Sequence, residues 1–289
     1  MHSPNSRRSP ARWPADFALS VLAPAARAAD EAAELRPSIM SSVWQLGLAQ
    51  AVADTEACAS QQPTVQNALL LEEPARGDAA AALAIAAPLG FAKAIAEQGS
   101  GRQRRELPLF LRNQPHYSAI GHVDAGLFNG AGRPTRAIKT EAGYRILGTK
   151  GLVPIAAKCD HLLVLATCDG ADEALIVPMR EDGVVGVSAA RETLGLRACA
   201  MADIALDNVF VPAHMRLGEN AGANVQRIID SSRVALSAIL TGLSRAVFDI
   251  ALPYRKSAWS MARRSPGSKA LPSNWPTCRW RSARCDGWD

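Results

Sequence analysis

The chain has 289 residues, of which 48% are hydrophobic and 20% charged, and this indicates an ordinary soluble globular protein with material for two or three small domains. A net charge of +5 would normally suggest an anionic partner, but residues 257–289 carry six basic and two acidic side chains, which leaves +1 on the rest. We therefore predict no nucleic-acid partner and no membrane partner.

The cysteines and histidines are scattered along the chain. The six cysteines lack the spacing of a zinc ribbon or a redox pair, and the histidines lack metal-ligand spacing. Scattered thiols fit a reducing compartment, so we expect a cytoplasmic protein without a bound metal.

The first residues are rich in Ser, Pro, Arg and Ala and show no sustained periodicity. The pair Arg7–Arg8 and the small residues at 26–28 imitate an export signal, but prolines and Asp16 interrupt the apolar run between them. We expect residues 1–38 to be a disordered leader rather than a signal peptide.

Helical periodicity follows this segment. Apolar residues recur at helical spacing over 43–52 and 65–73, and 77–98 is long and alanine-rich. Asp78 can cap the third helix because a carboxylate accepts hydrogen bonds from the unpaired amides of a first turn, and Gly99 ends it. A charged turn is predicted next, at 102–106. Residues 39–118 are thus predicted to form an N-terminal helical domain.

Short β-branched runs then replace the helical period, at 144–146, 161–167, 173–179, 184–188 and 204–211. Gly, Asp and Pro separate them, which is typical of an antiparallel sheet or small barrel. From Val225 to Ile250 the helical period returns over about seven turns. We predict an α+β protein: a central antiparallel β domain at 119–215, then the first helix of a C-terminal helical bundle at 216–256.

This order of elements, with several short strings, resembles the acyl-CoA dehydrogenase family from about Leu46 to Lys256. No single string is diagnostic, and the resemblance rests on their order and spacing. The strings are LLLEEPARGDAAAALAIA at 69–86, GSGRQRRELPLF at 99–110, GYRILGTKG at 143–151, ETLGLRACAMADIALDNVFVPAHMRLG at 192–218 and TGLSRAVFDIALPYRK at 241–256.

The resemblance implies a flavoprotein oxidoreductase of fatty acid metabolism that binds FAD at a subunit interface of a homodimer or homotetramer. Members of the family take the proton alpha to an acyl-CoA thioester with a carboxylate and pass the beta hydride to the flavin, which yields the 2,3-enoyl-CoA. They deliver the electrons to an electron-transfer flavoprotein. Such a protein needs a flavin wall and a base.

The family's flavin wall corresponds to two segments of this chain. The family often has Trp-x-Thr after a Gly-x-Lys turn, whereas Leu152, Val153 and Pro154 stand here, and Pro154 offers neither a hydroxyl nor an amide hydrogen. Gly121 and His122 fall where the family has a Thr-Glu or Gln-Glu pair. The resemblance implies that these five residues line the cofactor; alternatively, His122 is a solvated loop histidine.

No catalytic base can be assigned from the sequence. In most branches the catalytic Glu lies in the last helical domain, and in one branch it immediately precedes the arginine matched here by Arg233. That position is Ser232, and Asp230 is turned about 200° away around the helix. Arg233 is a candidate for a supporting role at the thioester pocket, or else an ordinary surface arginine.

Beyond Lys256 the resemblance stops. Restoring one base after the Lys256 codon, with GC-rich codons, yields ERVEHGAPKPGQQGVAFELADL in the neighbouring frame, which has the family's pattern. Our hypothesis is that a one-base deletion put residues 257–289 out of frame, so we expect a disordered tail and a truncated bundle.

Two functions stay open at this point. The chain is either an acyl-CoA dehydrogenase-like flavoprotein with impaired catalysis, or a non-catalytic remnant without a stable flavin. Acyl chain length and branching have no signature in the sequence.

Overall fold

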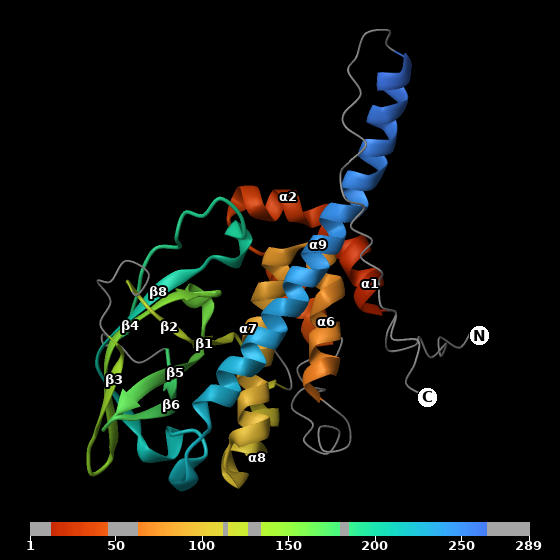
Figure 1. Cartoon of the computed structure of the whole chain (residues 1–289). Helices are drawn as coiled ribbons and strands as arrows, with labels where there is room; N and C mark the ends of the chain where they lie inside the picture. The colour runs from red at the N-terminus through yellow and green to blue at the C-terminus, as the bar shows by residue number, and fades with distance from the viewer. Residues whose placement is uncertain (1–12, 46–62, 112–114, 127–133, 180–184, 265–289) are drawn as a thin grey trace, which may run out of the picture. The chain divides into compact units, whose positions relative to one another are not determined.

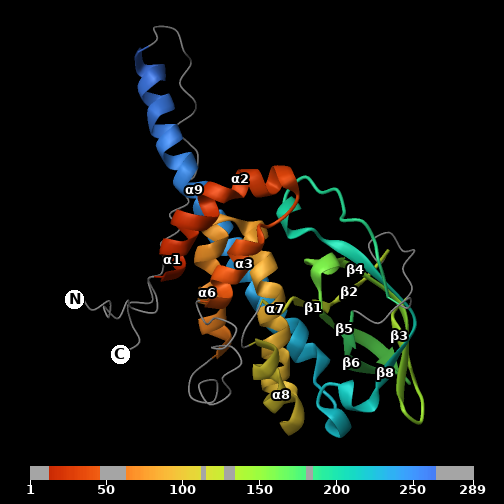
Figure 2. The same ribbon diagram turned by 180° about the vertical axis from the view of Figure 1, so that it is seen from behind.

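The computed structural model describes residues 13–45, 63–111, 115–126, 134–179 and 185–264. The chain divides into two compact units, residues 1–246 and 247–289, and each is described by itself. The first unit contains a group of helices, a curled β-sheet and the first part of the long helix α9 (Val225–Arg264), as Figures 1 and 2 show from opposite sides. The described part of the second unit continues α9.

The N-terminal segment is helical from Trp13 onward. It forms α1 (Trp13–Phe17), a short π-helix (Ala18–Leu22), α2 (Ala23–Ala32) and α3 (Pro37–Gln45). The expected disordered leader through residue 38 is therefore wrong over this range. Phe17, Leu22 and Ala29 are buried. Pro24 directly follows the π-helix in an uninterrupted helical run, so the proline does not end the helix here.

The central helices are α6 (Pro63–Gly77) and α7 (Ala79–Gln98). The α7 helix is buried on nearly every side, as an alanine-rich helix without a polar face must be. The Asp78 carboxylate accepts a hydrogen bond of 2.8 Å from the Ala80 amide, and the Gly99 amide donates to the Ile95 carbonyl. These contacts confirm the predicted cap and the predicted end of the helix. The helix predicted at 43–52 lies mostly outside the described residues.

The segment at 102–106 belongs to a helix, α8 (Gly101–Leu111), and the predicted turn is wrong. A capping box starts this helix. The Gln103 amide donates to the Ser100 hydroxyl at 3.2 Å, while the Ser100 amide donates to the Gln103 side-chain oxygen at 2.9 Å. Two otherwise unpaired amides are satisfied in this way, which outweighs the run of like charges that follows.

The described strands form one eight-stranded sheet. Its main path runs β1-β5-β3-β4-β8-β7, with β2 beside β4 and β6 beside β5. The strands are β1 (Ser118–Gly121), β2 (Val123–Asp124), β3 (Arg136–Lys139), β4 (Gly143–Val153), β5 (His161–Cys168), β6 (Ala171–Pro178), β7 (Val185–Val187) and β8 (Ala202–Pro212).

Most strand pairs are antiparallel, as predicted, but β1 and β3 pair with β5 in parallel. The sheet is thus mixed. Because β5 pairs with β1 and β3 in parallel and with β6 antiparallel, it lies inside the sheet, and almost all of its residues are buried. The β8 strand instead alternates between buried and more exposed residues. The α7 helix packs against β1, which brings the helices and the sheet together.

The first unit holds its part of α9 at two places. Near the start of α9, the Gln98 side chain accepts a hydrogen bond of 2.6 Å from the Asn224 amide. Near residue 242, α9 meets α6 so closely that a Cβ on Gly242 would lie 2.0 Å from the Glu72 carbonyl oxygen, and Arg245 pairs with Glu73 at 2.9 Å. Between these two contacts α9 spans a pocket.

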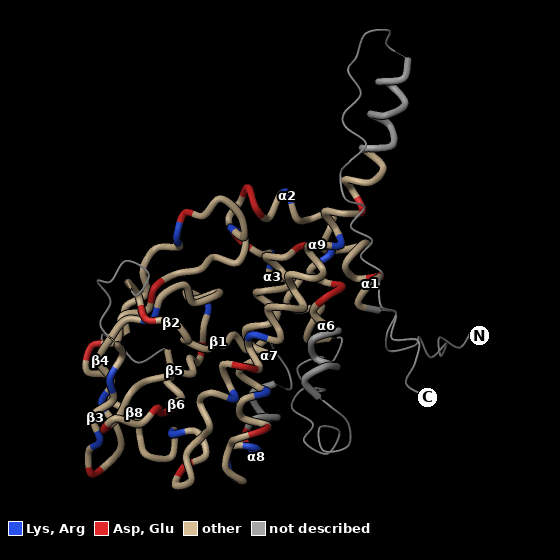
Figure 3. The backbone as a smooth tube through the Cα atoms, viewed as in Figure 1, with Lys and Arg blue, Asp and Glu red and all other residues tan. Residues whose placement is uncertain are grey.

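Two described helices are long and apolar enough to cross a membrane, judged by length and composition alone. In α7, 72% of the apolar window is buried inside the protein, as expected of a core helix, whereas in α9 only 17% is buried. The exposed apolar residues of α9 in the first unit include Leu236, Leu240 and Leu243. Acidic and basic residues are interspersed along the described backbone (Figure 3).

Candidate functional site

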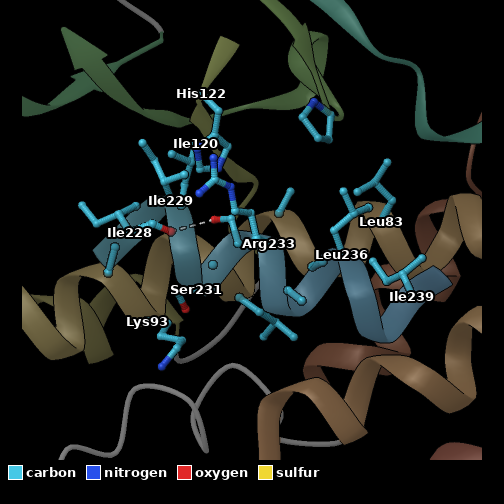
Figure 4. A pocket seen from close by; sticks show the side chains of 18 of the residues that line it. Leu83, Lys93, Ile120, His122, Ile228, Ile229, Ser231, Arg233, Leu236 and Ile239 are labelled. Carbon is cyan, nitrogen blue, oxygen red and sulfur yellow. Dashed lines mark hydrogen bonds between the residues drawn. The ribbon is translucent and has the colours of Figure 1, made fainter. Parts of the chain in front are cut away.

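A pocket of about 600 Å³ lies between α7, α9 and one end of the sheet (Figure 4). Its walls are mostly aliphatic, and its polar side chains are few and fall into separate groups. This combination is typical of sites for small molecules and cofactors. Charged or titratable side chains among the described lining residues are Lys93, Glu97, His122 and Arg233.

The sheet supplies one wall of the pocket. Ile120 comes from β1, Val123 from β2, and His122 lies between these strands. Leu152 comes from the end of β4, and Pro154 directly follows this strand. This wall depends on close backbone packing: a Cβ on Gly121 would lie 2.8 Å from the Cγ atom of Lys150, so a larger residue would push this part of the wall outward.

A β-bulge directs Leu152 into the pocket. The pairing of β4 with β8 shifts register between Lys150 and Val153, and Leu152 takes a left-handed conformation with φ of 55°. Leucine rarely adopts a positive φ. The Asp203 carboxylate stabilises this backbone conformation by accepting a hydrogen bond of 3.2 Å from the Leu152 amide. The side chain is therefore 38% exposed, whereas that of Val153 is 1% exposed.

The five residues that the resemblance implied for the cofactor divide into two groups. His122, Leu152 and Pro154 line the pocket. Gly121 and Val153 are buried and do not belong to the described lining. Gly121 supports the wall from behind by packing against Lys150.

The His122 imidazole faces the pocket and keeps contact with solvent. Enclosure by surrounding protein atoms, and secondarily the positive charge of Lys150, lower its pKa to about 4. His122 is therefore neutral at pH 7, so it can donate one hydrogen bond and accept another.

The α9 helix supplies the opposite wall, which includes Ser232 and Arg233. The Ser232 hydroxyl donates a hydrogen bond of 3.1 Å to the Ile228 carbonyl, so its proton is already engaged by the helix backbone. Arg233 donates a 3.0 Å hydrogen bond to Asp230, and both side chains are mainly exposed. In Figure 4, Arg233 lies on the side of α9 that faces His122.

Sequence reasoning missed one charged group at the site. Lys93 and Glu97 lie one helical turn apart on α7, their side chains are only 9% and 14% exposed, and they form an ion pair. The second Glu97 oxygen lies 3.5 Å from Nε of Arg227 on α9. A Lys and a Glu four residues apart within an alanine-rich helix are the signal that could have revealed this pair.

Comparisons with known proteins agree with this architecture. The profile of the family "Acyl-CoA dehydrogenase, N-terminal domain" matches residues 11–112. The probable acyl-CoA dehydrogenase YngJ of Bacillus subtilis is 27% identical over 83% of this chain and 66% of its own length. The caffeyl-CoA reductase-Etf complex subunit CarC of Acetobacterium woodii is 28% identical over 48% of this chain and 38% of its own length.

Solved structures show the same fold. The butyryl-CoA dehydrogenase of Megasphaera elsdenii superposes with a TM-score of 0.71 at 21% identity, over 94% of this chain and 71% of that one. A glutaryl-CoA dehydrogenase of Mycobacterium smegmatis in complex with FADH2 gives 0.67 at 24% identity, over 80% and 60%. These matches show an acyl-CoA dehydrogenase N-terminal domain at residues 11–112 and a similarity to acyl-CoA dehydrogenases over most of the chain. The chain spans 66% and 38% of the length of the two curated relatives named above.

Proposed function

We propose that this chain provides the flavin- and thioester-binding part of an acyl-CoA dehydrogenase-type oxidoreductase, with FAD as cofactor and an acyl-CoA as substrate. The supporting observation is the single pocket that joins a strand wall to two apolar helices. Such a pocket has room both for a flat ring against the sheet and for an acyl group between the helices.

The strand wall fits a flavin ring. Ile120, Val123, Leu152, Pro154 and Met201 present apolar surface, and a flat aromatic ring gains stability by covering such a surface. His122 adds one neutral hydrogen-bonding group. A bound flavin would supply the hydride acceptor, which no side chain can supply.

Arg233 would act on the polar part of the substrate. Its partner Asp230 is exposed and three residues away on the same helix, and such pairs contribute little. Arg233 can therefore exchange this partner for a carbonyl or phosphate oxygen of a ligand. His122, on the opposite wall, can donate to the same ligand without adding charge.

No carboxylate among the described residues of the pocket is free to accept the substrate's alpha proton. Among the described residues that line the pocket, Glu97 is the one carboxylate, and both its oxygens are engaged by Lys93 and Arg227. Ser232 stands at the α9 position where one branch of the family has its catalytic Glu. These facts favour a second candidate function, binding of flavin and thioester without rapid turnover.

One experiment separates these candidates. The full chain is mixed with FAD, passed over gel filtration, examined for the flavin absorbance band, and then titrated anaerobically with acyl-CoA. Bleaching of the band indicates dehydrogenation, and a retained band without bleaching indicates binding alone. Absence of the band, and of any FAD effect on thermal unfolding, would refute both.

A matched pair of variants places the flavin at the proposed wall. Leu152→Asp sets a charge against the apolar surface and should lower FAD affinity at least tenfold, because an uncompensated charge is costly beside an apolar ring. Leu194→Asp is the control, since Leu194 is fully exposed in a loop outside the pocket lining.

We further propose a homo-oligomer that passes electrons to an electron-transfer flavoprotein in the cytoplasm.

A further inference from the structure

The part of the pocket between α7 and α9 forms an apolar slot. Leu83, Ala87 and Gly90 line it from α7, Leu236 and Ile239 from α9, and Ile120 from β1. These side chains offer no hydrogen bonds and no charge. A group that enters the slot is therefore stabilised by apolar contact alone.

Nearby charges are already neutralised by one another. At one end, Lys93 pairs with Glu97, which also lies 3.5 Å from Arg227. Past the other end, Arg245 pairs with Glu73 at 2.9 Å and with Glu72. A carboxylate entering the slot would have to compete with Glu97 for Lys93 and would then lie near a second carboxylate, which is unfavourable in a poorly hydrated site.

Arg233 does not change this conclusion. In Figure 4 it lies on the side of α9 that faces His122, whereas Lys93 belongs to α7. Its guanidinium is largely exposed and pairs with Asp230. It is therefore placed to meet the polar head of a ligand, beside the strand wall, rather than the far end of an acyl group.

Gly90 keeps the slot open. A Cβ at this position would meet only the Cδ1 atom of Ile120, at 3.5 Å, which is an ordinary contact. Neither close packing nor backbone conformation requires glycine here, although glycine within a helix costs about 1 kcal/mol relative to alanine. The space beside Gly90 is thus available to a ligand.

We propose that the slot accepts uncharged acyl groups, discriminates against acyl groups that end in a carboxylate, and depends on Gly90 for its width. This inference rests on the proposed function, because it assumes that the pocket binds an acyl-CoA. It adds to that function the class of acyl group that the slot accepts and the residue, Gly90, that sets the width of the slot.

The test measures equilibrium binding by calorimetry on the full chain loaded with FAD, using CoA, pentanoyl-CoA and glutaryl-CoA. Pentanoyl and glutaryl groups have the same number of carbons, so their difference reports the terminal carboxylate. We expect pentanoyl-CoA to bind at least tenfold more tightly than glutaryl-CoA or CoA. Equal affinities for pentanoyl-CoA and glutaryl-CoA would overturn the proposal.

Variants at Gly90 test the fit independently. Gly90→Val should weaken pentanoyl-CoA binding about tenfold, the effect expected when one or two carbon atoms obstruct an apolar pocket, and leave CoA binding unchanged. Gly195→Val is the control and should behave as wild type, since a Cβ at Gly195 meets no atom within 4 Å and Gly195 lies outside the pocket lining. If Gly90→Val lowers the affinities for CoA and pentanoyl-CoA equally, or lowers neither, Gly90 does not set the width of the acyl slot.

Removal of one charge completes the design. Glu97→Gln removes the partner carboxylate of Lys93, so glutaryl-CoA affinity should rise at least threefold while that of pentanoyl-CoA stays the same; an unchanged glutaryl-CoA affinity would contradict the charge argument. If FAD, CoA and both thioesters all fail to bind, the proposed function fails and this inference fails with it. If they bind without discrimination, only this inference fails.

Discussion

Lys150 and Asp124 form a buried ion pair that supports the strand wall of the pocket. Nζ of Lys150 lies 2.6 Å from Oδ1 of Asp124, and the Lys150 side chain is 2% exposed. The Thr135 hydroxyl donates a second hydrogen bond of 2.6 Å to the same carboxylate oxygen. Because the Lys150 side chain also packs directly on Gly121, this pair fixes the strand that leads to His122.

The first prediction concerns this pair. Lys150→Met leaves Asp124 with Thr135 but without its cation, so the free energy of unfolding should fall by about 3–5 kcal/mol. Lys150→Met combined with Asp124→Asn removes both charges and should cost clearly less than the sum of the single changes. Urea denaturation of the four proteins measures this coupling, and additive costs would show that the pair contributes nothing.

A second prediction concerns the contact between α9 and α6. Glycine to alanine within a helix usually stabilises by about 1 kcal/mol. Gly242→Ala should instead destabilise, because its Cβ would lie 2.0 Å from the Glu72 carbonyl oxygen. Gly90→Ala on α7 is the control and should follow the usual trend. Thermal unfolding of both variants checks the opposite signs; a stabilised Gly242→Ala would mean that α9 does not approach α6 so closely.

Local signals in the sequence were enough to predict much of the fold. Asp78 and Gly99 delimit α7 because capping depends only on neighbouring residues, and the strand predicted at 204–211 lies within β8. The parallel pairing of β1 with β5 could not be predicted, since it joins segments some forty residues apart. The N-terminal helices could not be predicted because residues 1–38 show no sustained periodicity, whereas Phe17, Leu22 and Ala29 become buried only in the folded chain.

The site was less predictable than the fold. Leu152 and Val153 are adjacent and equally apolar, and only the bulge after Lys150 decides which one faces the pocket. Glu97 was not identified because its importance comes from Arg227, which is far away in the sequence. For residues 265–289 the hypothesis of an altered reading frame lies outside the described residues. The α9 helix extends to Arg264, past the point where the family pattern ends, so the expected disorder of the tail is wrong over 257–264.

A third prediction concerns pH. The pKa of His122 is about 4 in the folded chain, below the value of about 6.5 usual for an unfolded one. Between these values the unfolded state binds more protons, so the contribution of His122 to stability is full above about pH 6.5 and is lost as the pH falls toward 4. His122→Gln should therefore flatten the loss of thermal stability over this range. His214→Gln, at a histidine outside the pocket lining, is the control and should leave the profile unchanged. If the thermal stability of wild type and His122→Gln changes with pH in the same way, the pKa of His122 is not lowered by folding.

The fourth prediction concerns the apolar stripe on α9. Leu240 and Leu243 are 54% and 39% exposed, and contiguous exposed apolar surface promotes association. The double variant Leu240→Gln with Leu243→Gln should change the free energy of unfolding by about 0.5 kcal/mol or less, because both side chains remain in contact with water and glutamine is a good helix former. Sedimentation velocity should show less self-association than in the wild type.

Ile239→Gln is the matched control on the same helix. Ile239 is 4% exposed, so this substitution places an amide among apolar side chains and should destabilise the chain by about 2–4 kcal/mol. If the double variant associates as strongly as the wild type while Ile239→Gln unfolds as expected, the stripe is not the associating surface. A loss of stability in the double variant as large as that in Ile239→Gln would instead show that Leu240 and Leu243 are covered in solution.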